Sequence, residues 1–146
     1  MKSIFKTICI SSDHAGFKTK ELIKNFLIEN YLSIIDLGPQ EDKSVDYPDF
    51  AKKIAKRIRS KRSEIGILVC GSGTGMAISA NKTKGIRAAV GYNIKSTQLS
   101  RQHNNANVLV IGGRTTSLNS AKKIIDVFVS TEFEKGRHSK RLKKIS

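Results

Sequence analysis

The sequence predicts an α/β fold: a three-layer α/β/α sandwich with a five-stranded parallel sheet and a C-terminal basic helix. Short apolar runs rich in β-branched residues alternate along the chain with amphipathic segments, which is typical of a parallel sheet with helices on both faces. The runs are apolar almost without interruption, as in residues 65–70, which is expected of strands covered on both sides. At 146 residues the chain has the length of one domain, and we expect residues 1–146 to form it.

The elements are expected in strict alternation as far as the tail. Apolar runs predict strands at residues 5–11, 32–37, 65–70, 86–92 and 107–111. Helical patterns follow them at residues 17–30, 49–59, 76–82, 94–103 and 119–130, and a basic tail helix is expected from Gly136 to Lys144. Helix 17–30 is expected to place Leu22, Ile23, Phe26 and Leu27 on one side, as a helix packed on a sheet requires.

The net charge of the chain is +15, from 27 Lys and Arg against 12 Asp and Glu. A nucleic-acid-binding protein usually gathers such charge on one face, with aromatic or Arg contacts to bases. Here the basic residues are spread along the chain, and 19 of the 27 are Lys. We therefore expect a solvated Lys-rich surface with no specific nucleic-acid partner. Its field should nevertheless attract anionic substrates.

Two features predict the compartment. No apolar run has membrane-spanning length, and the first residues lack the long apolar stretch of a secretion signal. Cys9 and Cys70 both fall in predicted strands, where reduced thiols are expected. We therefore expect a cytoplasmic protein without a membrane partner.

Residues 70–75, Cys-Gly-Ser-Gly-Thr-Gly, follow a buried strand and precede a helix, at the edge of the sheet where α/β proteins bind ligands. The backbone N–H groups of such a turn point at an anion, although an ordinary strand-to-helix turn is an alternative. A dinucleotide fingerprint is excluded because position 76 is Met and no acidic residue occurs between Glu64 and Asp126. A P-loop lacks its Gly-Lys-Ser/Thr, and a cysteine phosphatase loop would need Arg where Met76 stands.

Cys70 closes the predicted strand beside a helix N-terminus. That position should lower the pKa of its thiol, and the hydroxyl of Ser72 should be able to reach the sulfur. A small buried hydrophobic residue is the alternative for Cys70, and it is the interpretation we keep for Cys9.

Polar residues at other element ends carry open alternatives. Asp13 is a candidate helix cap and His14 a candidate anion contact. His103 is a candidate dipole partner at a helix C-terminus, where Asn105 is a candidate C-cap. Arg114 follows the last strand.

Two arginines in the tail, Arg137 and Arg141, are four residues apart and share a helix face. They suit a phosphate, whose oxygens accept bidentate hydrogen bonds from guanidinium groups, or they belong to a solvated basic tail.

Together these segments resemble the B-type ribose-5-phosphate isomerase family, which also includes the galactose-6-phosphate isomerase subunits. The resemblance covers essentially the whole chain and rests on eight motifs in order: 12–16 (Ser-Asp-His-Ala-Gly), 46–48 (Asp-Tyr-Pro), 70–75, 80–82 (Ala-Asn-Lys), 85–87 (Gly-Ile-Arg), 99–104 (Leu-Ser-Arg-Gln-His-Asn), 107–109 (Asn-Val-Leu) and 136–138 (Gly-Arg-His) with Arg141. Each motif is weak alone, but their order and spacing together are specific. The resemblance implies a Rossmann-like sandwich and an aldose–ketose isomerase.

The resemblance also implies roles for residues. Cys70 corresponds to the base that moves a proton between C1 and C2, and His103 to the group that opens the sugar ring. Contacts to the enediolate oxygens are implied for Gly71, Ser72, Gly73, Thr74, Gly75 and Asn104. Contacts to the sugar hydroxyls are implied for Asp13, and contacts to the phosphate for His14, Arg114, Arg137 and Arg141. We add Ser72 to the catalytic candidates and Asp46, Tyr47 and His138 as further binding candidates; Tyr47 is alternatively a core aromatic before Pro48.

The expected reaction is the interconversion of ribose 5-phosphate and ribulose 5-phosphate. It needs a base and oxyanion donors, but no redox cofactor, and we expect no cofactor and no metal. The alternatives are isomerisation of a six-carbon sugar phosphate, or a phosphate- or nucleic-acid-binding module without activity. The expected helix 94–103 carries His103 about 15 Å from its own Cys70, at 1.5 Å of rise per residue. We therefore expect a homodimer, or a pair of such dimers, with active sites shared between subunits.

Overall fold

A computed structural model describes residues 2–145, and its centre is a five-stranded parallel sheet. The strands are β1 (Thr7–Ser12), β2 (Ile34–Asp36), β3 (Glu64–Cys70), β4 (Ala88–Val90) and β5 (Val108–Gly112). Their order across the sheet is β2-β1-β3-β5-β4. All neighbouring pairs are parallel, so every strand ends at the same edge. The predicted α/β sandwich is confirmed.

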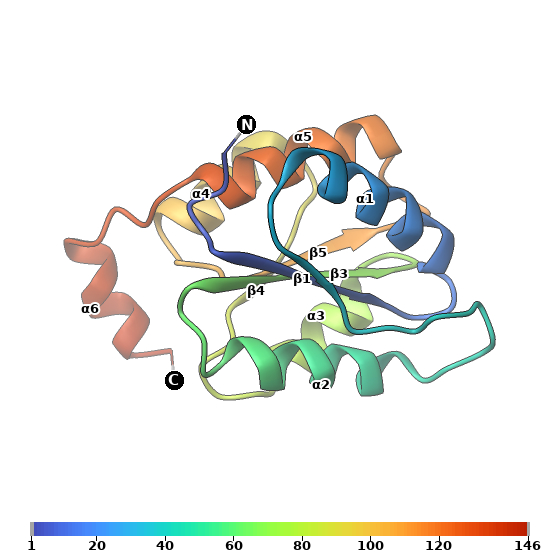
Figure 1. Ribbon diagram of the computed structural model, residues 1–146. Coiled ribbons are helices and arrows are strands. Elements are labelled where there is room, and N and C mark those ends of the chain that lie inside the picture. The colour runs from blue at the N-terminus through green and yellow to red at the C-terminus, as the bar shows by residue number, and fades with distance from the viewer. Residues whose placement is uncertain (1, 146) are drawn as a thin grey trace.

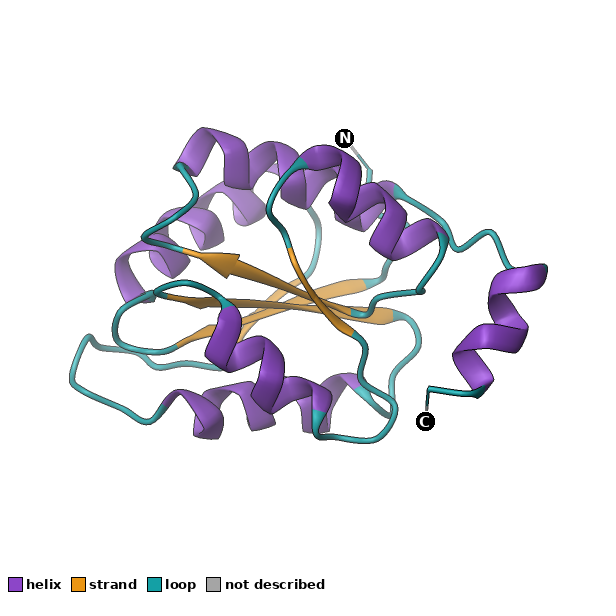
Figure 2. Ribbon diagram, turned by 180° about the vertical axis from the view of Figure 1, so that it is seen from behind, coloured by secondary structure: helices purple, strands orange, loops and turns teal. Residues whose placement is uncertain are grey.

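Helices cover both faces of this sheet (Figures 1 and 2). They are α1 (Phe17–Asn30), α2 (Tyr47–Ile58), α3 (Thr74–Asn81), α4 (Ile94–Gln102), α5 (Leu118–Ser130) and α6 (Arg137–Lys143). Figure 1 shows α1, α4 and α5 above the sheet and α2 and α3 below it. The short α6 stands apart from the body, near the edge where the strands begin. None of the helices in residues 2–145 is long and apolar enough to span a membrane.

The core lies in two layers, one on each face of the sheet. On one face Ile10, Ile67 and Ile111 pack against Ile23 of α1 and Phe128 of α5. On the other face Leu68 and Val110 pack against helix residues, which are Ala51, Ile54 and Ile58 of α2 and Met76 and Ala80 of α3. Strands β1, β3 and β5 are buried along their whole length, while β2 and β4 are half-buried edges.

The predicted ends of most elements differ from the observed ones by one or two residues. The edge strands are shorter than expected, because the apolar runs at 32–37 and 86–92 extend beyond the residues that pair with a neighbour. Helix α2 begins at Tyr47 rather than at position 49, because Pro48 lies in the first turn, where no backbone N–H is needed. These differences leave the topology unchanged.

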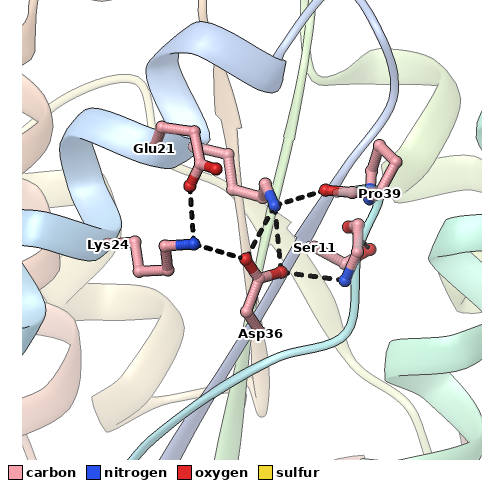
Figure 3. A network of polar contacts seen from close by, with 7 residues as sticks. Ser11, Glu21, Lys24, Asp36 and Pro39 are labelled. Atoms are coloured by element: carbon pink, nitrogen blue, oxygen red, sulfur yellow. Dashed lines mark hydrogen bonds and ion pairs between the residues drawn. The ribbon is translucent and has the colours of Figure 1, made fainter. Parts of the chain in front are cut away.

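Polar contacts around Asp36 and Pro39 fix the segment that follows β2 (Figure 3). The Lys20 ammonium is fully buried and donates to both carboxylate oxygens of Asp36 (2.9 and 2.8 Å) and to the carbonyl of Pro39 (2.7 Å). Lys24 approaches the same carboxylate at 2.9 Å. Burial alone would raise the pKa of Asp36, but the hydrogen bonds from Lys20 and Lys24 reverse this and lower it. The network ties α1 to the chain that leads to Tyr47.

Candidate active site

Cys70 and the turn after it form the centre of the carboxyl edge of the sheet. Cys70 ends β3, is 5% exposed, and its Sγ accepts a hydrogen bond from the N–H of Gly73 at 3.2 Å. Gly73 precedes α3 with φ of +87°, a left-handed conformation that favours glycine. The thiol thus lies at the end of the strand and faces the N–H groups of the following turn. This arrangement fits a group that handles a proton beside a developing oxyanion.

The expected direction of the Cys70 pKa was wrong. Burial is the largest influence and raises the pKa of the thiol, and the nearby carboxylate of Asp13 adds to this effect. Hydrogen bonds from the N–H groups of Met76 and Gly73 act in the opposite direction but do not overcome burial. The sequence showed the helix N-terminus but not how completely the sulfur is enclosed, so the resting group is the thiol.

The hydroxyl of Ser72 does not bond to the sulfur in the described part of the chain. It accepts a hydrogen bond from the N–H of Thr74 at 3.3 Å instead, so it supports the first turn of α3. The expectation that it reaches Cys70 is therefore not met in this structure.

Tyr47 lies against the glycine-rich turn. A Cβ built on Gly75 would come within 2.8 Å of Cε1 of Tyr47, so Gly75 leaves room for the ring. Tyr47 is 43% exposed, which rules out the alternative of a core aromatic. Asp46 precedes it at the N-cap position of α2 and is exposed, without a capping bond from its side chain.

Asp13 and His14 follow β1 at the same edge. Asp13 is buried, and its Oδ1 accepts a hydrogen bond from the N–H of Gly16 at 2.8 Å. This local bond resembles the predicted cap, although the N-cap position itself is Gly16. His14 is exposed, with Nδ1 3.1 Å from the backbone nitrogen of Val45. The backbone contact orients the imidazole at the rim of the edge.

Arg114 reaches this edge from the end of β5. Its N–H donates to the carbonyl of Gly71 at 2.9 Å. A Cβ on Gly71 would lie 3.4 Å from Nη1 of Arg114, so the guanidinium covers the start of the turn. The structure therefore gathers the following predicted residues at one edge: Asp13, His14, Asp46, Tyr47, Cys70, Gly71, Ser72, Gly73, Thr74, Gly75 and Arg114.

The remaining predicted residues lie at the other end of the strands. His103 is the C-cap of α4, and its ring stacks on that of His138 in α6, with centroids 4.3 Å apart. Asn104 follows His103 and is exposed. Arg137 and Arg141 belong to α6 and are also exposed. Burial lowers the pKa of His138, and its electrostatic interactions with His103 and Arg137 lower it further.

The sheet register shows how far apart the two groups are. Gly66 pairs with Val108, at the start of β5, and Cys70 pairs with Gly112, at its end. The turn that carries His103 leads into Val108, so it belongs to the starting edge. Four strand residues separate the two levels, a distance of about 13 Å at roughly 3.3 Å per residue. His103 and Cys70 of one chain do not meet.

Sequence reasoning missed the carboxylate that joins the two imidazoles. Oε1 of Glu134 lies 3.8 Å from Nε2 of His103 and 3.7 Å from Nε2 of His138. The four-residue spacing of Glu134 and His138 was a visible signal for this pair. The three side chains make a group of possible metal ligands, with ligand atoms within 4.8 Å of one another. The two rings are nearly parallel, at 13°, so their in-plane lone pairs run side by side and would have to tilt to converge on one ion.

Known proteins are similar to this chain in sequence and in fold. The ribose/galactose isomerase family matches residues 8–145. The chain is 41% identical to ribose-5-phosphate isomerase B of Escherichia coli over 97% of its own length and 95% of the relative's.

Solved structures agree with that match. The ribose 5-phosphate isomerase from Thermotoga maritima superposes with a TM-score of 0.92 at 47% identity, covering 95% of this chain and 96% of the other. The Mycoplasma genitalium ribose-5-phosphate isomerase B with bound ribulose-5-phosphate gives 0.89 at 39% identity, covering 95% and 93%. A match this complete, in sequence and in fold, places the chain in the ribose/galactose isomerase family and makes it an aldose–ketose isomerase.

Proposed function

We propose that the protein interconverts ribose 5-phosphate and ribulose 5-phosphate through an enediolate, with Cys70 as the base. The observation that carries this proposal is the Cys70 thiol, buried at the end of β3 and facing the N–H of Gly73. Aldose–ketose exchange removes a proton from one carbon and returns it to the next, which a single base placed over the C1–C2 bond can do. Because the resting group is a thiol, it must lose its proton before it acts.

The turn after Cys70 supplies the second requirement, stabilisation of the enediolate. The N–H of Gly73 already points at the sulfur, and the first turn of α3 has further N–H groups without helical partners. Negative charge that develops on the sugar oxygens beside these donors would be stabilised without reorganisation of the protein. Thr74 and Gly75 belong to the same turn, and Tyr47 and Asp13 border it and are proposed to contact the sugar.

The phosphate is proposed to bind between His14 and Arg114 of one chain and Arg137 and Arg141 of another. A guanidinium group offers paired N–H donors that match phosphate oxygens, and an imidazolium adds charge. Remote contacts of this kind position the reacting carbons and supply binding energy for the chemical step.

We also propose that the active site is built from two subunits of a homodimer. His103 and Asn104 lie about 13 Å along the strands from Cys70, as the sheet register indicates. A two-fold axis would bring His103 of the partner to Cys70, and would do so twice. In this arrangement His103 opens the sugar ring, Asn104 holds an enediolate oxygen, and His138 stacks behind His103. The free thiols of Cys9 and Cys70 fit the proposed cytoplasmic location.

A direct assay tests the reaction. The purified protein is incubated with ribose 5-phosphate, and ribulose 5-phosphate is measured, with galactose 6-phosphate and allose 6-phosphate assayed in parallel. We expect kcat/KM to be at least tenfold higher for the pentose. A preference for either hexose phosphate would replace the proposed substrate while keeping the reaction class. Absence of turnover with all three would overturn the proposal.

A further inference from the structure

A second charged cavity lies at the amino edge of the sheet, away from Cys70. Its volume is about 420 Å³, within the range of small-molecule sites. Glu64 at the start of β3, Arg87 just before β4 and Asn107 just before β5 line it. Leu142 of α6 also lines it. The carboxyl-edge residues proposed to act on the sugar do not line this cavity.

The lining is strongly cationic. Its positive side chains are Arg59, Lys61, Arg62, Arg87 and Arg101. Among the described residues of the lining, Glu64 is the one carboxylate, and Arg57 donates two hydrogen bonds of 2.7 and 2.9 Å to it. Within residues 2–145, none of the five cationic side chains forms an ion pair with a carboxylate. The cavity therefore concentrates positive charge that no carboxylate of residues 2–145 neutralises by an ion pair.

Arg101 is the strongest sign that this charge has a ligand. The residue is only 3% exposed, and its hydrogen bonds go to neutral oxygens, among them the carbonyls of Thr131 (2.9 Å) and Ala106 (2.7 Å). Burial, and secondly the charge of Arg87, lowers the pKa of Arg101 to about 10. Buried charges in proteins are normally paired.

Arg87 repeats the pattern. Its Nε donates to the carbonyl of Asn105 at 2.9 Å, and burial together with the charge of Arg62 lowers its pKa. An anion in the cavity would compensate the charges of Arg62, Arg87 and Arg101 at once.

We propose that this cavity is a binding site for a small molecule with two or more phosphate groups. Guanidinium groups bind phosphate through paired N–H donors, whereas lysine binds it as a point charge, and the cavity offers both. One phosphate group carries roughly two negative charges, so five cations call for more than one group. Phe5 and Ile58 add apolar surface beside the charged wall, which would accept the organic part of a nucleoside diphosphate.

Calorimetric titration of the intact protein tests the site. Inorganic diphosphate and ADP are titrated separately at 0.15 M salt into the wild type and into three double variants. Arg59→Gln with Arg62→Gln removes two exposed cavity charges without touching buried groups. Arg137→Gln with Arg141→Gln changes the proposed sugar-phosphate site. Lys52→Gln with Lys56→Gln, on exposed positions of α2 outside the cavity lining, matches the loss of charge.

We expect the cavity variant to bind diphosphate or ADP at least tenfold more weakly than wild type, while the other two variants keep wild-type affinity for the same probe. Tighter binding of ADP would identify a nucleotide, and equal affinity an inorganic or other diphosphate. Loss of affinity in the Arg137/Arg141 variant alone would mean that the probes bind only the sugar-phosphate site. Equal losses in the Lys52/Lys56 variant would indicate a non-specific charge effect. Either result, or no binding to wild type, overturns the proposal, and each is independent of isomerase activity.

Discussion

The two edges of the sheet differ in what they are made of. The carboxyl edge is built on backbone: a turn with a left-handed Gly73 whose N–H faces the thiol of Cys70, and Gly75, which leaves room for Tyr47. The amino edge is built on side chains, with the stacked rings of His103 and His138 and the arginines around them. Backbone donors suit a negative charge that appears during a reaction, and titratable rings suit proton transfer to a ring oxygen. Among the described residues neither edge contains both, so the proposed mechanism needs two chains.

The same contrast applies to the two thiols. Cys9 lies inside β1 with Sγ 3.7 Å from the carboxylate of Glu64, and burial raises its pKa to about 11. Cys70 lies at the end of β3, where the turn gives it N–H neighbours. Both are buried and free, so position, not exposure, separates the proposed base from a structural residue.

The largest expected effect is the loss of the base. Cys70→Ala should lower kcat/KM with ribose 5-phosphate by about 10²- to 10⁴-fold, the usual contribution of a positioned acid–base group. No carboxylate stands in the turn to replace it, since positions 74 and 75 are Thr and Gly. Steady-state kinetics, with circular dichroism to confirm folding, measures the effect.

Cys9→Ala is the matched control and should keep turnover within about twofold of wild type. Activity of Cys70→Ala within a few fold of wild type would falsify the role of the thiol. A comparable loss in both variants would point to packing instead.

The next effect concerns the tail helix. Arg137→Ala and Arg141→Ala should each raise KM for the sugar phosphate by about 10- to 150-fold, because each removes a charge-assisted contact worth roughly 1.5–3 kcal/mol. Lys143→Ala is the control, because at 100° per residue it lies on the far side of α6 from both arginines. An unchanged KM in both arginine variants would show that α6 is only a solvated basic helix.

Much of this comparison was predictable from the sequence. Alternating apolar runs and helical patterns predicted the sheet and its ligand-binding edge, because a parallel strand that is buried on both faces consists of consecutive apolar residues. The motifs on which the family resemblance rests contain residues of both edges.

The sequence did not show how fully distant segments bury a side chain, or which distant side chains come into contact. The raised pKa of Cys70 depends on how chain segments far apart in sequence cover the sulfur. The contact of Glu134 with His103 spans a strand and a helix, and the basic residues of the cationic cavity come from positions 59 to 101. Such groupings follow from packing, which local patterns do not encode.

Mixing two inactive variants tests whether one active site uses Cys70 of one chain and His103 of the other. If His103 of one chain serves Cys70 of the other, a dimer of one Cys70→Ala and one His103→Ala subunit has one intact pocket and one doubly defective pocket. Random exchange in an equal mixture makes half of the dimers mixed, so activity should recover to about a quarter of wild type. Native mass spectrometry of differently tagged subunits verifies the exchange. Complete exchange of subunits without recovered activity would contradict the proposal of a shared site.

A smaller effect is expected with pH. Because the pKa of Cys70 is raised, the thiolate that acts as base is a minor species at pH 7, and its population should grow severalfold per pH unit up to pH 9. The rate of alkylation of Cys70 by iodoacetamide in the Cys9→Ala background should increase in parallel with kcat/KM. A plateau in both below pH 7.5 would show that the thiol pKa is lowered instead.

The smallest expected effect is that of a chelator on turnover, which we expect to be none. The place to look for a bound ion is the cluster of His103, Glu134 and His138, whose ligand atoms lie within 4.8 Å. The rings stack at 13° with centroids 4.3 Å apart, which directs their lone pairs alongside each other rather than to a common point, and Glu134 is half exposed. A tetrahedral site needs converging ligands about 2.0–2.2 Å from the metal, so binding would require the rings to separate. It would also occupy the nitrogen that His103 is proposed to use on the sugar.

EDTA should therefore leave kcat and KM unchanged. Added Zn²⁺ should inhibit the enzyme if it binds to this cluster, and Glu134→Gln should relieve the inhibition. Loss of turnover in EDTA that a divalent ion restores would make the cluster a metal centre and reverse the assignment of His103.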